Sequence, residues 1–159
     1  MIYHMRRNER QIEDWLILED ILQHGKYAAI ALCRQDEPYI VTLSYGYDKV
    51  NRTLYFHCSK DGLKSEFARQ NPHACITVID DKGYIKNECS HAYRSVVMRG
   101  RIEILDEHNE KLQGLDVLIG HLEENPELIK AGLPRKQHLL EGMNIWKFKI
   151  DEITGKEGR

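Results

Sequence analysis

One short segment of the sequence carries residue types that together could bind a phosphate group. Residues 54–64 read LYFHCSKDGLK, in which His57, Ser59 and Lys64 supply an imidazole, a hydroxyl and an ammonium group. The pattern predicts that a strand ends before Ser59, that Gly62 frees the backbone to turn, and that a helix then begins. A lysine in the first turn of a helix lies at the positive end of the helix dipole, which is unfavourable unless an anion binds there.

Two interpretations of this segment remain open from the residues alone. If the backbone N–H groups at the helix start converge with the Ser59 hydroxyl, a His57 nitrogen and the Lys64 ammonium, they can hold one phosphate dianion. Alternatively, Lys64 is a surface lysine at a frayed helix end. Asp61 counts against an anion at this place, unless its side chain turns away to cap the helix.

The sequence contains no self-contained catalytic or metal-binding motif. The glycine-rich dinucleotide fingerprint, the phosphate-binding P-loop, the Gly-x-Ser-x-Gly elbow and the His-Glu-x-x-His motif are all absent. The four cysteines are well separated and form no Cys-x-x-Cys pair, so we expect free thiols and no metal site. If the protein performs chemistry, we therefore expect a cofactor to carry it.

The composition is typical of one globular domain, which we expect to span residues 1–159. Hydrophobic residues make up 42% of the chain and charged residues 30%, with a formal net charge of −2. A nearly neutral chain argues against a nucleic-acid partner. The apolar runs are far shorter than the ~20 residues that cross a bilayer, and the first ten residues do not resemble a signal peptide. We therefore expect a cytoplasmic protein without a membrane partner.

The elements that must position residues 54–64 are mostly short strands. The predicted strands are residues 27–33, 39–45, 53–58, 73–80, 93–105 and 144–151, the predicted helices are residues 11–23, 62–71, 107–121 and 125–131, and residues 81–91 are predicted to be a polar loop. Short turns between the first three strands indicate an antiparallel meander. Gly100, in the middle of a long strand, predicts a bulge or bend. The expected fold is mainly β with helices (α+β): about six antiparallel strands curled into a small barrel.

The strand predicted at residues 39–45 has two different faces. Larger apolar side chains alternate with smaller, partly polar ones, the first set being Tyr39, Val41 and Leu43 and the second Ile40, Thr42 and Ser44. The second face suits a planar ring pressed against it, although an ordinary half-exposed strand fits the same pattern.

Five stretches of the chain, in their order, carry a resemblance to a known family. They read MRRNERQI (residues 5–12), PYIVTLSYGYD (38–48), LYFHCS-x2-GLK (54–64), YRSVVMRG (93–100) and IDEITGK (150–156). The chain resembles the pyridoxamine 5′-phosphate oxidase-like FMN-binding split barrels, and more narrowly the branch related to 5-nitroimidazole resistance proteins. The resemblance implies a homodimer of six-stranded split β-barrels with one FMN in each of two clefts at the interface.

The resemblance also implies a set of cofactor contacts. The first flavin strand would lie along the isoalloxazine ring, with backbone groups near Val41 and Thr42 facing the polar edge of the ring. Other residues would line the ribityl phosphate or reach the flavin from the other subunit. The implied contacts are Tyr39, Val41, Thr42, Leu43 and Ser44 at the ring, His57, Cys58, Ser59, Leu63 and Lys64 at the ribityl phosphate, and Ser95 and Trp146 from the partner subunit.

The chain departs from the oxidase itself at the first flavin strand. The oxidase begins this strand with arginine and ends it with lysine, whereas Tyr39 and Ser44 stand there in this chain. One phosphate-binding cation is therefore missing, for which His57 or an arginine within residues 6–10 could compensate. Because of this departure we do not expect oxidation of pyridoxamine phosphate.

Three functions follow as hypotheses. The first is an FMN-dependent oxidoreductase that takes electrons from a reduced nicotinamide and reduces a small acceptor, nitroaromatic or quinone-like. The flavin would exchange hydride, so no side chain needs to act as a general acid or base. The second is a flavin- or haem-binding sensor or store without turnover, with His57, His73 and His91 as histidines near the cleft. The third is a cofactor-free barrel that serves as a partner module.

Overall fold

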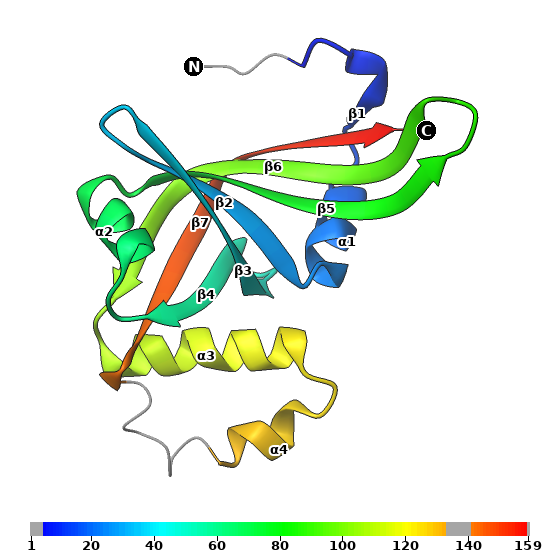
Figure 1. Cartoon of the computed structure of the whole chain (residues 1–159). Coiled ribbons are helices and arrows are strands. Elements are labelled where there is room, and N and C mark those ends of the chain that lie inside the picture. The colour runs from blue at the N-terminus through cyan, green and yellow to red at the C-terminus, as the bar shows by residue number, and fades with distance from the viewer. Residues whose placement is uncertain (1–4, 133–140, 159) are drawn as a thin grey trace.

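The computed structural model of the protein describes residues 5–132 and 141–158. Within these ranges seven strands form one antiparallel sheet in the order β1-β7-β4-β3-β2-β5-β6. Because β6 also pairs with β7, the six strands β2 to β7 close into a barrel (Figure 1). The strands are β1 (Gln11–Ile12), β2 (Tyr27–Arg34), β3 (Glu37–Asp48), β4 (Thr53–Ser59), β5 (His73–Ile85), β6 (Ser90–Leu105) and β7 (Met143–Gly158). The predicted six-stranded α+β barrel is confirmed.

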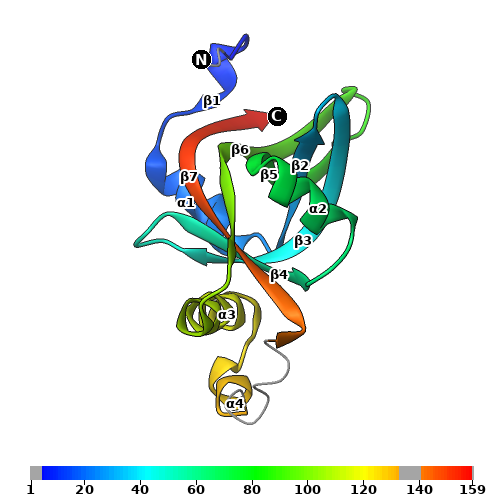
Figure 2. The ribbon, with the colours of Figure 1, turned by 90° about the vertical axis from the view of Figure 1, so that its left-hand side faces the viewer.

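Helices lie at the ends and along one side of the barrel. They are α1 (Trp15–His24), α2 (Leu63–Gln70), α3 (His108–Leu122) and α4 (Pro126–Lys130), and a 3-10 turn, η1 (Asn8–Arg10), precedes β1. Figure 2 shows α3 running beneath the barrel, with α2 on the flank near β2 and β3. The contacts agree, since α3 packs on β3 and β4, α2 on β2 and β3, and α1 on β5 and β6.

Large side chains from alternating strand positions fill the barrel. Trp146, Tyr45, Phe56 and Phe148 are fully buried there. The closure of the barrel requires a bend in β6, and the register between β6 and β7 shifts between Arg99 and Gly100. A side chain at Gly100 would collide with the carbonyl oxygen of Lys149. The irregularity predicted at this glycine is therefore present, although the extra residue, Asp151, lies on β7 opposite Arg99 and Gly100.

The helix predicted at residues 11–23 starts later than expected. Asp14 caps α1 by accepting a hydrogen bond from the Leu16 N–H (2.9 Å), so the helix begins at Trp15. Gln11 and Ile12 instead form β1, which pairs with the end of β7. The apolar periodicity could not separate these states, because a buried Ile12 fits either one, and in the structure it is buried on β1.

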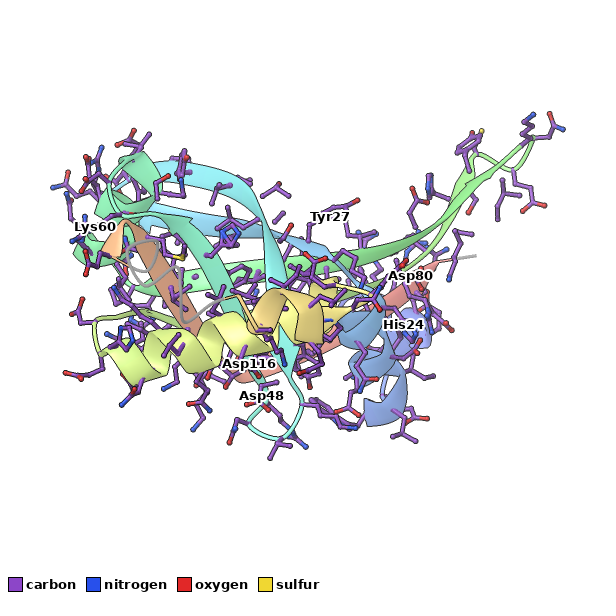
Figure 3. All side chains as sticks on the ribbon, turned by 90° about the horizontal axis from the view of Figure 1, so that it is seen from below. His24, Tyr27, Asp48, Lys60, Asp80 and Asp116 are labelled. Atoms are coloured by element: carbon purple, nitrogen blue, oxygen red, sulfur yellow. The ribbon has the colours of Figure 1, made fainter. Side chains whose placement is uncertain are left out.

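The polar loop predicted at residues 81–91 is wrong. β5 runs to Ile85 and β6 begins at Ser90, so the two strands form a long hairpin that projects from the barrel (Figure 3). Both faces of this hairpin meet solvent, and its side chains are polar for that reason. The polar side chains of this segment therefore indicate that it is exposed to solvent, and they do not indicate that it lacks a strand.

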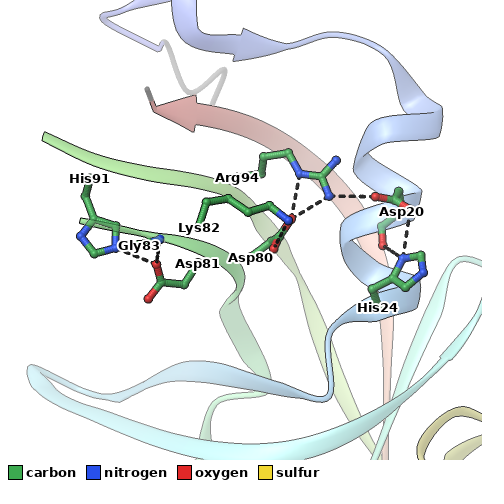
Figure 4. A network of polar contacts seen from close by, with 8 residues as sticks. All are labelled: Asp20, His24, Asp80, Asp81, Lys82, Gly83, His91 and Arg94. Carbon is green, nitrogen blue, oxygen red and sulfur yellow. Dashed lines mark hydrogen bonds and ion pairs between the residues drawn. The ribbon is translucent and has the colours of Figure 1, made fainter. Parts of the chain in front are cut away.

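A network of charged side chains joins this hairpin to α1 (Figure 4). The Arg94 guanidinium on β6 lies 2.8 Å from the Asp20 carboxylate on α1 and 2.6 Å from that of Asp80 on β5. Hydrogen bonds from Arg94 to both carboxylates raise the pKa of the guanidinium, which remains positively charged. The ion pairs hold α1 against the base of the hairpin.

Among the described residues, no helix is both long enough and apolar enough to span a membrane.

Candidate functional site

The barrel is split between β3 and β4 over part of their length. β3 pairs with β2 along residues 37–44, but it pairs with β4 only from Tyr45 to Asp48. After Phe56, the partner of Tyr45, β4 diverges from β3, and its residues His57 to Ser59 pair with β7 alone. In the parts of the chain that the structure describes, no strand therefore pairs with the outer edge of β3 over residues 39–44.

The register of β3 identifies which backbone groups face this open edge. The Tyr45 N–H donates to the Lys26 carbonyl (3.3 Å), so the polar groups of Tyr45 point towards β2. Successive residues of a strand point their N–H and C=O groups to opposite edges, and the pairing with β2 has no bulge. The residues whose backbone groups face the open edge are therefore Ile40, Thr42 and Ser44. The resemblance pointed to both Val41 and Thr42, whereas the register gives only Thr42 an open-edge position.

A groove of about 540 Å³ lies beside this open edge. It is lined by Leu43, His57, Cys58, Ser59, Lys64, Gly142 and Met143. Five of these residues were predicted from the sequence, and they come from β3, β4 and α2. Folding therefore brings Leu43 of the first predicted segment, residues 39–44, to the groove that residues of the second segment, 57–64, also line. Gly142, just before β7, and Met143, its first residue, were not predicted, because no local pattern links them to the groove.

The first turn of α2 faces the groove without a side-chain cap. Gly62 is the N-cap residue, has a φ of 123°, and makes no side-chain hydrogen bond to the helix. A Cβ atom at Gly62 would meet nothing, so the glycine is required by the backbone conformation and not by lack of space. Asp61 is exposed and does not cap the helix. Backbone N–H groups of the first turn are consequently available to an acceptor outside the protein.

Desolvation keeps two groups of the groove neutral near pH 7. Burial lowers the pKa of His57, so its imidazole is neutral there. Burial also raises the pKa of the Cys58 thiol and outweighs the hydrogen bond from Ser65 and the charges of Lys64 and Arg69, which lower it. Among the described residues that line the groove, Lys64 is the only lysine or arginine, and the His57 ring offers a nitrogen for a hydrogen bond.

Two buried polar residues behind the groove were missed by the sequence analysis. Asn144 and Ser65 are 4% and 0% exposed, and both bond to the loop between β4 and α2. Asn144 shares its strand parity with Trp146 and Phe148, whose side chains face the barrel interior. A polar residue at an inward-facing position was the available signal.

Other predicted contacts lie elsewhere. Trp146 is fully buried inside the barrel, and its contact with a flavin stays a prediction. Ser95 lies on β6, between Ile79 of β5 and Lys156 of β7, and its contact from a partner subunit stays a prediction. Tyr39 packs on the Phe67 ring at 5.0 Å between centroids.

The histidines considered for haem do not gather at the groove. His57 lines it, but His73 lies beside Arg101, whose Nη1 is 3.0 Å from His73 Nε2, and His91 bonds to Asp81 on the projecting hairpin. Within residues 5–132 and 141–158, no three His, Cys, Asp or Glu residues are grouped so that they could hold a metal ion.

Residues 14–157 match the family model described as pyridoxamine 5′-phosphate oxidase. The chain belongs to this family. Among relatives of the family, an uncharacterized protein of Rhizobium meliloti, RA0666, is 27% identical over 146 residues, which cover 87% of this chain and 88% of the relative.

Solved structures agree with the family assignment. A candidate 5-nitroimidazole antibiotic resistance protein of Bacteroides thetaiotaomicron is 25% identical, with a TM-score of 0.74 over 98% of this chain and 96% of that chain. A FAD-binding protein of Mesorhizobium loti is 23% identical, with a TM-score of 0.67 over 94% and 96% of the two chains. The flavocytochrome Anf3 of Azotobacter vinelandii is 17% identical, with a TM-score of 0.79 over 98% and 72%. The last two show a shared fold.

Proposed function

We propose that the groove binds FMN and that the protein is an FMN-dependent oxidoreductase. The acceptor would be a small molecule, nitroaromatic or quinone-like, and the electron donor a reduced nicotinamide. One observation carries this proposal. The β3 strand, which has an open edge, and the first turn of α2, which has no side-chain cap, both contribute residues to one groove. The relatives that bind FAD or combine flavin with a cytochrome support a flavin as the ligand class.

The β3 side of the groove fits the flavin ring. The polar edge of an isoalloxazine carries both hydrogen-bond donors and acceptors, and the open edge of β3 offers alternating N–H and C=O groups. The side chains of Leu43 and Met143 line the same groove and can cover apolar parts of the ring. Ring and strand edge therefore match in chemistry without any charged side chain.

The α2 side of the groove fits a phosphate. Lys64 supplies an ammonium, Ser59 a hydroxyl, and the first turn of α2 its backbone N–H groups. Asp61 does not cap the helix, so the N–H groups of the first turn stay unbonded to it, although its exposed carboxylate lies next to Gly62 and its charge counts against an anion. The donor set thus fits one phosphate monoester.

The residues of the groove bind and shield the ligand and are not arranged for acid–base chemistry. A bound flavin supplies hydride exchange at its N5 atom. His57 is neutral and the Cys58 thiol is protonated near pH 7, because burial disfavours the charged form of each. We therefore assign no catalytic side chain.

An absorption spectrum of the purified protein tests this proposal. We expect the two visible bands of an oxidised flavin, either in the protein as purified or after FMN is added, and oxidation of a reduced nicotinamide when a nitroaromatic or quinone acceptor is present. A Soret band without flavin bands would support the second candidate, a haem-binding protein, which the likeness to a flavocytochrome favours. A colourless protein that does not bind FMN would contradict both.

We also propose that two copies of the chain form a dimer through the outer face of β2, β5 and β6. The outward side chains there are small or β-branched, partly buried, and apolar in the main: Ala29, Ala31, Cys75, Thr77 and Val97. Tyr27 and Ile79 on the same face are 66% and 59% exposed. A hollow of about 780 Å³, lined in part by Ala31, Cys75 and Arg99, lies on this face. Apolar surface of this kind is typical of contacts between subunits.

Replacing Ala31 with glutamate should separate the dimer. A charged side chain in the middle of the contact loses its hydration without gaining a partner. We expect the elution mass of Ala31→Glu, measured by light scattering, to fall to that of one chain. Leu16→Glu is the control, since Leu16 on α1 is 70% exposed and does not line the hollow. A dimer that persists in Ala31→Glu, or a monomeric parent protein, would contradict the proposed interface.

A further inference from the structure

Two of the few buried polar side chains lie directly behind the loop at residues 59–62. Among the described Ser, Thr and Asn residues, three are buried: Thr53, Ser65 and Asn144. Thr53 bonds within its own turn, to the Asn51 carbonyl. Ser65 and Asn144 both bond to the loop that connects β4 to α2. Burial of two polar groups at one loop indicates that the conformation of this loop matters.

The hydrogen bonds hold two carbonyl groups of the loop towards the protein. The Asn144 amide donates to the Lys60 carbonyl (2.9 Å) and to Ser65 Oγ (3.3 Å), and Ser65 Oγ donates to the Ser59 carbonyl (3.4 Å). The Arg69 guanidinium on α2 also donates to the Lys60 carbonyl (3.0 Å). Two donors therefore fix this one carbonyl. Figure 3 labels Lys60 at this loop, where β4 ends beside α2.

The direction of these carbonyls sets the direction of the neighbouring N–H groups. In a trans peptide the C=O and the next residue's N–H point in opposite directions, and no cis peptide bond occurs in the described residues. With the carbonyls of Ser59 and Lys60 held inward, the N–H groups of Lys60 and Asp61 point outward. A flip of either peptide would turn a carbonyl oxygen outward, where it would repel a phosphate.

We propose that Asn144 and Ser65 are positioning residues that preset the loop at residues 59–62 to bind the phosphate of the cofactor. This inference rests on the proposed function of the groove. Neither side chain lines the groove. They act through the peptides of Ser59 and Lys60, so that outward N–H groups precede the uncapped turn of α2. A loop already held in its binding conformation loses less conformational freedom when the ligand binds.

Comparison of FMN with riboflavin separates this role from a general contribution to stability. Riboflavin has the same ring and ribityl chain but no phosphate, so a residue that acts on the phosphate changes the affinity for FMN alone. In Asn144→Ala we expect the affinity for FMN to fall about tenfold and the affinity for riboflavin to change less than twofold. Fluorescence quenching of each ligand by the full-length protein measures both values.

Val96→Ala is the matched control. Val96 is fully buried on β6 in the hydrophobic core of the barrel, and its truncation also removes buried atoms, but its side chain has no polar group that could bond to the loop. We expect both variants to unfold at lower temperature, whereas only Asn144→Ala should lower the ratio of FMN to riboflavin affinity.

Ser65→Ala is a second variant. It removes one hydroxyl group and changes the volume of the buried side chain very little. We expect the same selective loss for FMN, and in Asn144→Ala/Ser65→Ala a loss smaller than the sum of the two single effects, because both residues act on one loop. Equal weakening of FMN and riboflavin, or no change of either, would overturn the positioning role while FMN binding itself stands. A parent protein that does not bind FMN would overturn the proposed function, and the inference with it.

Discussion

Replacing Lys64 with alanine is expected to weaken FMN binding by about 1.5–3 kcal/mol, which is roughly tenfold to a hundredfold in affinity. Lys64 is half-buried in the first turn of α2 and lines the groove, so its ammonium can bond directly to a phosphate. Burial lowers the pKa of the His57 imidazole, which disfavours a compensating positive charge at this residue. The dissociation constant from fluorescence titration measures the effect.

Lys60→Ala is the control for this variant. Lys60 lies four residues before Lys64, and its side chain is exposed and does not line the groove. The substitution removes the same charge, so it reports the long-range attraction that both lysines exert on a dianion, which salt screens. We expect less than a threefold change with Lys60→Ala. Unchanged retention of FMN by Lys64→Ala would remove the assignment of the phosphate to this groove.

Replacing Gly46 with alanine is expected to lower the free energy of unfolding by about 2–3 kcal/mol. Gly46 lies on β3, where this strand pairs with β4, and α3 crosses directly over it. A Cβ atom there would lie 2.6 Å from the Cα and N atoms of Leu118 and 2.8 Å from the carbonyl carbon of Val117. These are backbone atoms of α3, so the whole helix must move. Urea denaturation measures the loss: the midpoint concentration of urea should fall, while the dependence of the free energy on urea concentration stays the same.

The same helix offers a control of opposite sign. Gly120 lies on the exposed side of α3, and the nearest atom to a Cβ there is Lys130 Nζ at 3.8 Å. Since alanine favours the helix over glycine, Gly120→Ala should raise the free energy of unfolding by about 0.5–1 kcal/mol. If Gly46→Ala unfolds at the same urea concentration as the parent protein, the close packing of α3 on β3 is contradicted.

Local patterns in the chain were sufficient to predict most strands and the helix after Gly62. Runs of apolar, β-branched and aromatic residues predicted β2 and β4 to within one residue, but only residues 39–45 of β3, which runs from Glu37 to Asp48. The turn residues and the short segment around Ser59 and Lys64 likewise report local backbone preferences. These features depend only on residues a few positions apart in the chain, so they can be predicted from the sequence.

Pairing between distant segments decided the rest of the site. The open edge of β3 exists because β4 leaves it after Tyr45 to pair with β7, a strand that follows about ninety residues later in the printed sequence. Asn144 reaches the loop at residues 59–62 through that same pairing. Trp146, one pleat further along, turns into the core for the same reason. Residue types and their local spacing thus specified the donors of the groove, whereas long-range register specified which of them converge, since register is set by contacts that no short window of the chain contains.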